Sequence, residues 1–156
     1  MLKNRNCLRA LAMFIALGTI FSVITAEAAG ETPNLIGSWQ GEATVLLQHK
    51  GETEMTTQHQ TLEITQQDGV LIRGIHSWRA GDVAVKGHVS GQHVVEAHEP
   101  FLGAIGQSGR TLRMVETDDP GMLFGVLNGT DEMEVEYFES GTNAVVWNAI
   151  LRRKPR

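Results

Sequence analysis

Apolar and polar side chains alternate with a period of two along most of the chain from Leu35 onward. In the first such run, Trp39, Ala43 and Val45 share one face, and polar residues occupy most of the positions between them. A period of two is typical of a β-strand with one buried face, whereas an amphipathic helix shows a period near 3.6. The alternation therefore predicts a protein built almost entirely of strands.

Short turns rich in Gly, Asp and Asn separate the runs, and Asn128-Gly129 is the strongest of them as a hairpin signal. Pro100 predicts an edge, a bulge or a bend, because proline has no N–H to donate to a sheet. We expect eight or nine strands, in the runs 35–48, 54–66, 70–79, 83–90, 93–105, 111–117, 122–127, 132–139 and 144–153.

The short connections favour a meander of antiparallel strands, since parallel neighbours need long crossovers. An antiparallel sheet of about eight strands either closes on itself or exposes two edges, and closure removes the aggregation hazard of those edges. We therefore expect an all-β fold, an antiparallel up-and-down β-barrel of about eight strands, with an open β-sandwich as the alternative. A barrel of this size holds a packed interior or one small ligand.

The first 29 residues have the pattern of an export signal. Lys3, Arg5 and Arg9 precede an apolar run over 11–24, and small residues at 26–29 offer a cleavage site. A retained membrane helix is the alternative, but the apolar run is shorter than the roughly 20 residues that a bilayer span needs. We expect cleavage, a single domain over residues 30–156, no membrane span after cleavage, and a periplasmic or secreted location.

Cleavage after residue 29 would remove Cys7, the only cysteine, and would leave 10 basic and 17 acidic residues. Such an acidic chain is a poor candidate for nucleic-acid binding, which depends on Lys and Arg neutralising phosphates. The sequence has none of the common motifs for a nucleophilic serine, a phosphate loop or a zinc protease. We therefore assign no catalytic residue, no cofactor and no metal ligand.

Gly37-Ser38-Trp39 near the start of this barrel resembles the Gly-x-Trp signature of the calycin group, which includes lipocalins and avidin-like proteins. The resemblance implies that Trp39 closes one end of the barrel and that Arg152 or Arg153 on the last strand covers it; a guanidinium over an indole contributes about 0.5 to 2 kcal/mol. Biotin binding is not implied, because Gly41 stands where avidin-like proteins have an Asn.

The mature chain is also similar to small exported bacterial proteins of lipocalin-like type that have no assigned activity. The similarity is clearest over the segments 113–116, 124–127 and 134–137. It implies a fold and a compartment, and it supplies no catalytic residue. The lipocalin turn Thr-Asp-Tyr is absent, and the most similar tripeptide is Thr117-Asp118-Asp119. The last expected strand reaches almost to the end of the sequence, where lipocalins have a further helix.

His76 and Trp78 are the leading candidates for a ligand site. They share a strand face with Ile72, so if Ile72 points inward an imidazole and an indole do so as well. In the opposite register Leu71 and Ile75 are buried and His76 is exposed. Glu96 is the third candidate.

His93 and His98 flank Glu96 and Glu99, a composition that would suit a divalent metal. The two histidines differ by an odd number of positions, however, and so point to opposite faces of a regular strand.

These observations favour an exported, non-catalytic barrel that binds a small apolar or amphipathic ligand in its cup. The alternative is a protein-interaction module, such as an inhibitor or an envelope accessory factor, with a solid barrel. A barrel-type isomerase using His76, Glu96 and Glu99 is a third hypothesis.

Interior volume separates the first two hypotheses. Small residues such as Gly74, Gly87 and Ala43 would line a cavity, whereas Phe101, Phe124, Trp147 and the methionines would fill it. The oligomeric state stays open.

Overall fold

The computed structural model of the chain describes residues 31–49, 51–80, 85–86, 93–94 and 96–155. The expected export signal, residues 1–29, lies outside the described residues, as does most of the expected run 83–90. Within the described ranges, no helix is long and apolar enough to cross a membrane.

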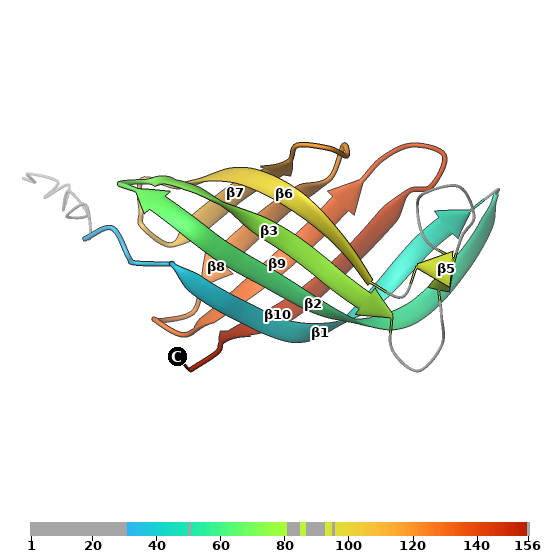
Figure 1. Cartoon of the computed structure of the whole chain (residues 1–156), viewed down its shortest axis with the longest axis horizontal. Coiled ribbons are helices and arrows are strands. Elements are labelled where there is room, and N and C mark those ends of the chain that lie inside the picture. Colours follow the sequence, from blue (N-terminus) through green and yellow to red (C-terminus); the bar gives the residue numbers. More distant parts are fainter. Residues whose placement is uncertain (1–30, 50, 81–84, 87–92, 95, 156) are drawn as a thin grey trace, which may run out of the picture.

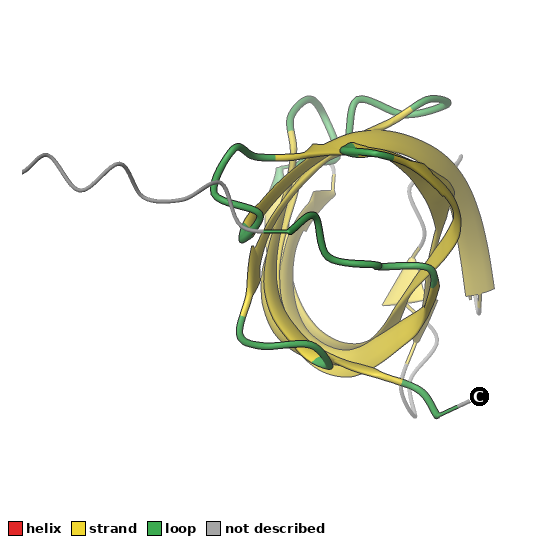
Figure 2. Ribbon diagram, turned by 90° about the vertical axis from the view of Figure 1, so that its left-hand side faces the viewer, coloured by secondary structure: helices red, strands yellow, loops and turns green. Residues whose placement is uncertain are grey.

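Eight antiparallel strands close into one barrel, as Figures 1 and 2 show. The barrel strands are β1 (Gly37–His49), β2 (Glu52–Asp68), β3 (Leu71–Ala80), β6 (Glu96–Ile105), β7 (Thr111–Glu116), β8 (Met122–Leu127), β9 (Glu132–Glu139) and β10 (Val145–Arg153). Two shorter strands, β4 (Val85–Lys86) and β5 (His93–Val94), pair with each other outside the barrel sheet.

Closure depends on the pairing of the first strand with the last. Ala43 of β1 lies opposite Ala149 of β10, while the other edge of β1 pairs with β2 over its whole length. The predicted antiparallel barrel of eight strands is confirmed, and the open sandwich is excluded. Most barrel neighbours are consecutive in sequence, and β3 and β6 become neighbours because β4 and β5 lie outside the sheet.

The tight turns follow the expected chemistry. Gly69 between β2 and β3 has φ of 55°, and Gly129 between β8 and β9 has φ of 101°, a region that side chains rarely adopt. Pro100 lies within β6 where the ladder to β7 ends, and its carbonyl accepts a hydrogen bond from the Thr117 N–H. Because N–H and C=O of one residue face the same antiparallel neighbour, the missing proline N–H falls at the end of that ladder.

The predicted alternation sorts side chains to the two faces of the barrel wall. In β3, Ile72, Gly74 and His76 face the interior, while Leu71 and Ile75 are 61% and 38% exposed. The register with Ile72 inward is therefore the observed one. The interior residues of the other strands form the core, in which Trp39, Leu62, Leu123, Met133 and Leu151 are fully buried.

The two ends of the barrel differ. At the closed end, residues 31–36 run across the ring of strands, as seen in Figure 2, and bury Leu35. Gln67 holds this stretch, because its amide accepts from the Leu35 N–H at 2.8 Å and donates to the Pro33 carbonyl at 2.8 Å. The turns 117–121 and 140–144 and the start of β6 lie at the opposite end, which we call the mouth.

Candidate functional site

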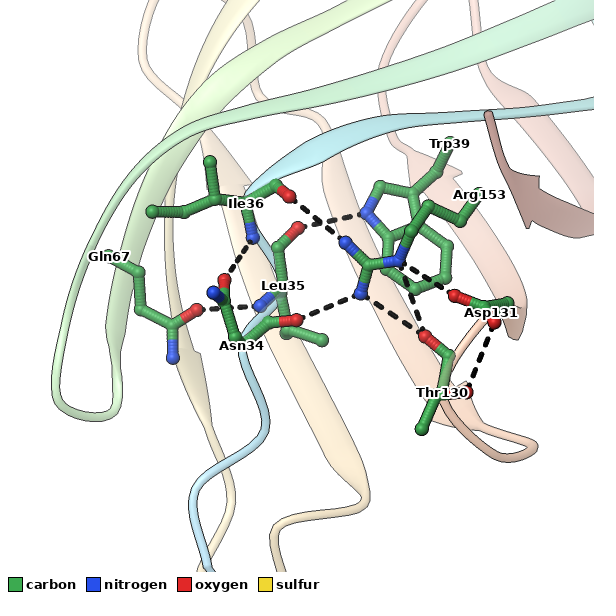
Figure 3. A network of polar contacts seen from close by, with 8 residues as sticks. All are labelled: Asn34, Leu35, Ile36, Trp39, Gln67, Thr130, Asp131 and Arg153. Atoms are coloured by element: carbon green, nitrogen blue, oxygen red, sulfur yellow. Dashed lines mark hydrogen bonds and ion pairs between the residues drawn. The ribbon is translucent and has the colours of Figure 1, made fainter. Parts of the chain in front are cut away.

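The closed end is built around Trp39. Its indole N–H donates to the Leu35 carbonyl at 3.0 Å, and the Arg153 guanidinium lies 4.1 Å from the centre of the indole ring (Figure 3). Arg153 also donates to the carbonyls of Ile36, at 2.9 Å, and Asn34, at 2.8 Å, and pairs with Asp131 at 3.1 Å. One side chain of the last strand thus fixes the stretch that precedes the first.

The sequence left the choice between Arg152 and Arg153 open, and the structure places them on opposite faces. Arg153 covers Trp39, whereas Arg152 points outward and pairs with Glu132 at 2.9 Å. Gly37 has φ of 141°, and an added Cβ there would lie 3.4 Å from the Arg153 guanidinium. The positive φ, which side chains rarely adopt, therefore favours glycine at residue 37, next to the arginine that covers the tryptophan.

Large side chains fill the closed half of the interior. Phe101, Met114 and Met133 are each at most 2% exposed. A Cβ added to Gly74 would lie 2.8 Å from the Phe101 ring, so this glycine makes room for a side chain and lines no empty space. Phe124 was expected as interior filler but is 39% exposed on the outer face, and Gly87 lies outside the described residues. A ligand would therefore have to sit towards the mouth.

A buried polar cluster occupies the mouth half of the interior. The Nδ1 atom of His76 lies 2.6 Å from Oε1 of Glu116, and its Nε2 atom lies 3.0 Å from Oε1 of Gln60. Gln60 in turn donates to Gln58 at 3.2 Å. An oxygen of a carboxylate and an oxygen of an amide therefore lie beside the two ring nitrogens, so the imidazole is held by polar contacts on both sides.

Tyr137 extends this cluster towards the mouth. Its hydroxyl lies 2.9 Å from Oε2 of Glu116 and 3.0 Å from Oε2 of Glu139. Burial, followed by the charges of Glu116 and Glu139, raises the pKa of the Tyr137 phenol, which stays protonated and able to donate. The hydrogen-bonded chain therefore reaches from the buried Gln58 to the half-buried Glu139.

Aromatic rings surround the imidazole of His76. The ring centres of Trp78, Tyr137 and Trp147 lie 5.2, 5.6 and 5.6 Å from it, and Tyr137 stacks on Trp147 at 5.4 Å with 7° between the planes. A few oriented polar groups between apolar walls are the usual composition of a small-molecule site. Trp78 and Glu139 are half-buried, so they form the accessible edge of the cluster.

The structure brings His76 and Trp78 together and separates both from Glu96. Trp78 and His76 face inward, whereas Glu96 lies on the outer face, opposite Arg79, with a carboxylate oxygen 3.6 Å from Nε2 of His98. Glu96 and Arg79 help to line an outer groove of about 460 Å³ that runs over β1, β2 and β3. Glu99, three residues later and on the opposite face, is the register partner of His76.

Sequence reasoning missed five members of the inner cluster: Gln58, Gln60, Glu116, Tyr137 and Glu139. The signal was present in the alternation. Glu116 lies two positions after Met114 and Gln60 lies two positions before Leu62, so each polar residue falls on the apolar face of its strand. A polar residue that falls on the apolar face of a strand marks a buried polar group, and such groups need partners. Which strands bring those partners together could not be read from the alternation alone.

The outer face carries a row of exposed apolar residues that lie directly opposite one another on successive strands. The row runs Leu102, Val115, Met122, Phe138, Val146, Leu46 and Met55. Phe124 adjoins it, with its ring centre 6.1 Å from that of Phe138. Single exposed apolar residues are normal, whereas aligned ones indicate a contact surface.

The fold resembles that of a solved β-barrel. The chain is similar to the protein in "Structure of EF1p2_mFAP2b bound to DFHBI", with a TM-score of 0.50 and 10% sequence identity over 77% of this chain and 94% of that one. A redesigned β-barrel, b11L5F_LGL, gives a TM-score of 0.44 at 12% identity over 84% and 98% of the two chains. No family model and no curated protein matches the chain.

Proposed function

We propose that this protein is an exported, non-catalytic β-barrel of calycin type that binds a small apolar or amphipathic ligand at the mouth end of its interior. The observation that carries the proposal is the cluster of His76, Trp78, Tyr137 and Trp147, in which three aromatic rings surround a hydrogen-bonded polar centre. A barrel interior needs only apolar packing for stability. Burying these polar groups costs desolvation free energy that an apolar core avoids.

The arrangement of the two halves supports a mouth site. The closed half is filled and sealed by Trp39 and Arg153, which gives the mouth half a rigid floor. Sites on rigid strands hold their groups more accurately than sites on loops. EF1p2_mFAP2b, which shares the barrel architecture, has been determined with the small molecule DFHBI bound. A barrel of this general build is therefore compatible with small-ligand binding.

The export part of the proposal rests on residues 1–29 and places the mature protein in the periplasm or outside the cell. N-terminal sequencing of the protein recovered from its own cell envelope tests it. A mature chain that starts within a few residues of 30 is expected, and a chain that still begins at Met1 would overturn this part.

A protein-interaction module is the second candidate, and the row of exposed apolar residues that includes Met122 and Phe138 favours it. Native mass spectrometry of the mature protein, purified from its own envelope, separates the two candidates. The first predicts a retained small molecule, and the second predicts a retained partner chain. Recovery of the bare chain would count against both.

A reporter titration tests the location of the site. N-phenyl-1-naphthylamine, an uncharged amphipathic molecule, becomes fluorescent in apolar surroundings. We expect it to bind the native protein and to bind Trp78→Ala about tenfold more weakly, because the accessible indole at the cluster is lost. Phe124→Ala is the matched control, since this aromatic residue lies on the outer face. Weakening by Phe124→Ala and none by Trp78→Ala would place the site outside the barrel.

A further inference from the structure

Glu99 has an unusual position in the mouth half. Glu99 lies on β6, opposite His76 of β3, and its half-buried side chain faces the interior of the barrel. Among the residues that the structure describes, Glu99 has no hydrogen-bond or ion-pair partner. Its neighbour Glu116 is engaged by His76 and Tyr137, so the polar cluster does not use Glu99. Within the described part of the chain, a carboxylate thus faces the mouth without an internal partner.

The charged groups that face Glu99 come from every neighbouring element. His76 lies on β3, Glu116 on β7, Asp118 and Asp119 on the following turn, and Glu139 on β9. His76 is in contact with Glu116, whose Oε1 lies 2.6 Å from Nδ1 of the ring. The arginines described on β3 and β7, namely Arg73, Arg79 and Arg113, are exposed on the outer face.

Partial burial, followed by the charges of Glu116, Asp119, Asp118 and Glu139, raises the pKa of Glu99. Among the described residues, the charges that act on Glu99 are therefore negative, and a positive group that entered the mouth would relieve this repulsion.

The aromatic rings are an independent reason to expect the same ligand charge. The ring faces of Trp and Tyr attract organic cations, and Trp78 stands one inward position beyond His76 on the same strand. Trp78 lies opposite Ala97, and Glu99 is the next inward residue of β6, so the two side chains occupy neighbouring inward positions of adjacent strands. Among the described residues no group of three or more His, Cys, Asp or Glu could hold a metal ion, so an organic cation suits this mouth better than a metal.

We propose that Glu99 is the specificity-determining residue of the mouth site and that it selects amphipathic ligands carrying a protonated amine. The ammonium group pairs with the Glu99 carboxylate beside the Trp78 indole, and the apolar part of the ligand lies against the aromatic rings. This inference rests on the proposed ligand site and adds the charge of its ligand.

Displacement of bound N-phenyl-1-naphthylamine by three eight-carbon molecules tests the inference. Octylammonium, octanol and octanoate differ in head-group charge and share one apolar chain. We expect octylammonium to compete about tenfold more effectively than octanol and octanoate to be the weakest, as one charge-assisted hydrogen bond implies. In Glu99→Gln the advantage of octylammonium over octanol should disappear. Glu96→Gln is the matched control, because Glu96 lies on the same strand and on the outer face.

Each outcome decides between the two proposals. If the reporter does not bind the native protein, the ligand site itself fails and the charge selection fails with it. If the reporter binds and the three molecules compete equally, or if Glu99→Gln keeps the preference for octylammonium, the mouth site stands and the role of Glu99 is overturned. Displacement of octylammonium by Ca²⁺ at equal concentration would instead assign the carboxylates to a metal. Circular dichroism of both variants controls for folding.

Discussion

The two ends of the barrel interior obey the same alternation and serve different purposes. At the closed end the inward positions include Trp39 and Leu62, and Arg153 lies over Trp39 with carbonyls and Asp131 as its partners. At the mouth the inward positions include His76, Glu116 and Glu99, which must be desolvated, paired or left facing like charges. The closed end therefore stabilises the fold. At the mouth, the burial of polar groups lowers the stability of the fold, and we attribute these groups to the proposed ligand site.

The largest expected effect tests the closed end. Trp39→Ala removes a fully buried indole and the surface on which Arg153 rests, so we expect a loss of about 3 to 5 kcal/mol in the free energy of unfolding. Urea denaturation measures it. Trp78→Ala at the mouth is the comparison and should cost less, since Trp78 is half-buried. A loss below about 1 kcal/mol for Trp39→Ala would show that Trp39 does not seal the barrel.

An intermediate effect tests the buried contact between His76 and Glu116. Glu116→Gln keeps the shape of the side chain and replaces the buried carboxylate that contacts both the His76 ring and the Tyr137 hydroxyl, so we expect a loss of about 2 to 3 kcal/mol at neutral pH. Glu132→Gln, which breaks an exposed pair with Arg152, should cost less than about 1 kcal/mol. Equal losses in the two variants would mean that the inner pair contributes no more than a surface one.

The smallest effect has the opposite sign and concerns Glu99. Its pKa is raised in the folded state, so the folded protein binds this proton more tightly than the unfolded chain does. The resulting stabilisation is fully present below the unfolded pKa of about 4 and is lost as the pH rises through the folded pKa. Glu99→Gln should therefore raise stability at pH 7 to 8, by less than about 1 kcal/mol because the group is mostly solvated, and the gain should vanish near pH 4.

Thermal unfolding across this pH range checks the difference, with Glu96→Gln as the reference on the outer face. A destabilised Glu99→Gln at neutral pH would show that Glu99 supports the fold and is not held against like charges. Together with the other two variants, this result determines whether the closed end contributes more to the free energy of unfolding than the mouth does.

Much of the closed end could be predicted from local sequence. The alternation through Trp39, Ala43 and Val45 fixes which face is buried, and the hairpin signal at Asn128-Gly129 fixes where β8 and β9 meet. The choice between Arg152 and Arg153 follows from the register Trp39 to Arg153, which no local pattern contains. The placement of Glu96 was also a matter of phase: it lies one step out of register with the inward residues Ala97 and Glu99.

The mouth could be predicted only in part. His76 and Trp78 were found because they share a strand with Ile72, whereas Glu116 and Tyr137 lie 40 and 61 positions further along the chain than His76. Their contact depends on β3 and β7 both bordering β6, and on the curvature that brings β9 across the interior to face them. Long-range pairing of this kind is set by closure, and closure is a property of the whole sheet.

The sequence by itself determined the strand content and the turns, because these follow from a period of two and from residues that accept positive φ. It favoured the closed topology, and the structure decided between barrel and sandwich and chose the inward face of β3. The tertiary structure alone decided which inward polar groups meet. Side chains from distant strands converge inside a barrel only when register, tilt and closure are all fixed together. For this protein that convergence gives His76 its partners and leaves Glu99 facing the mouth.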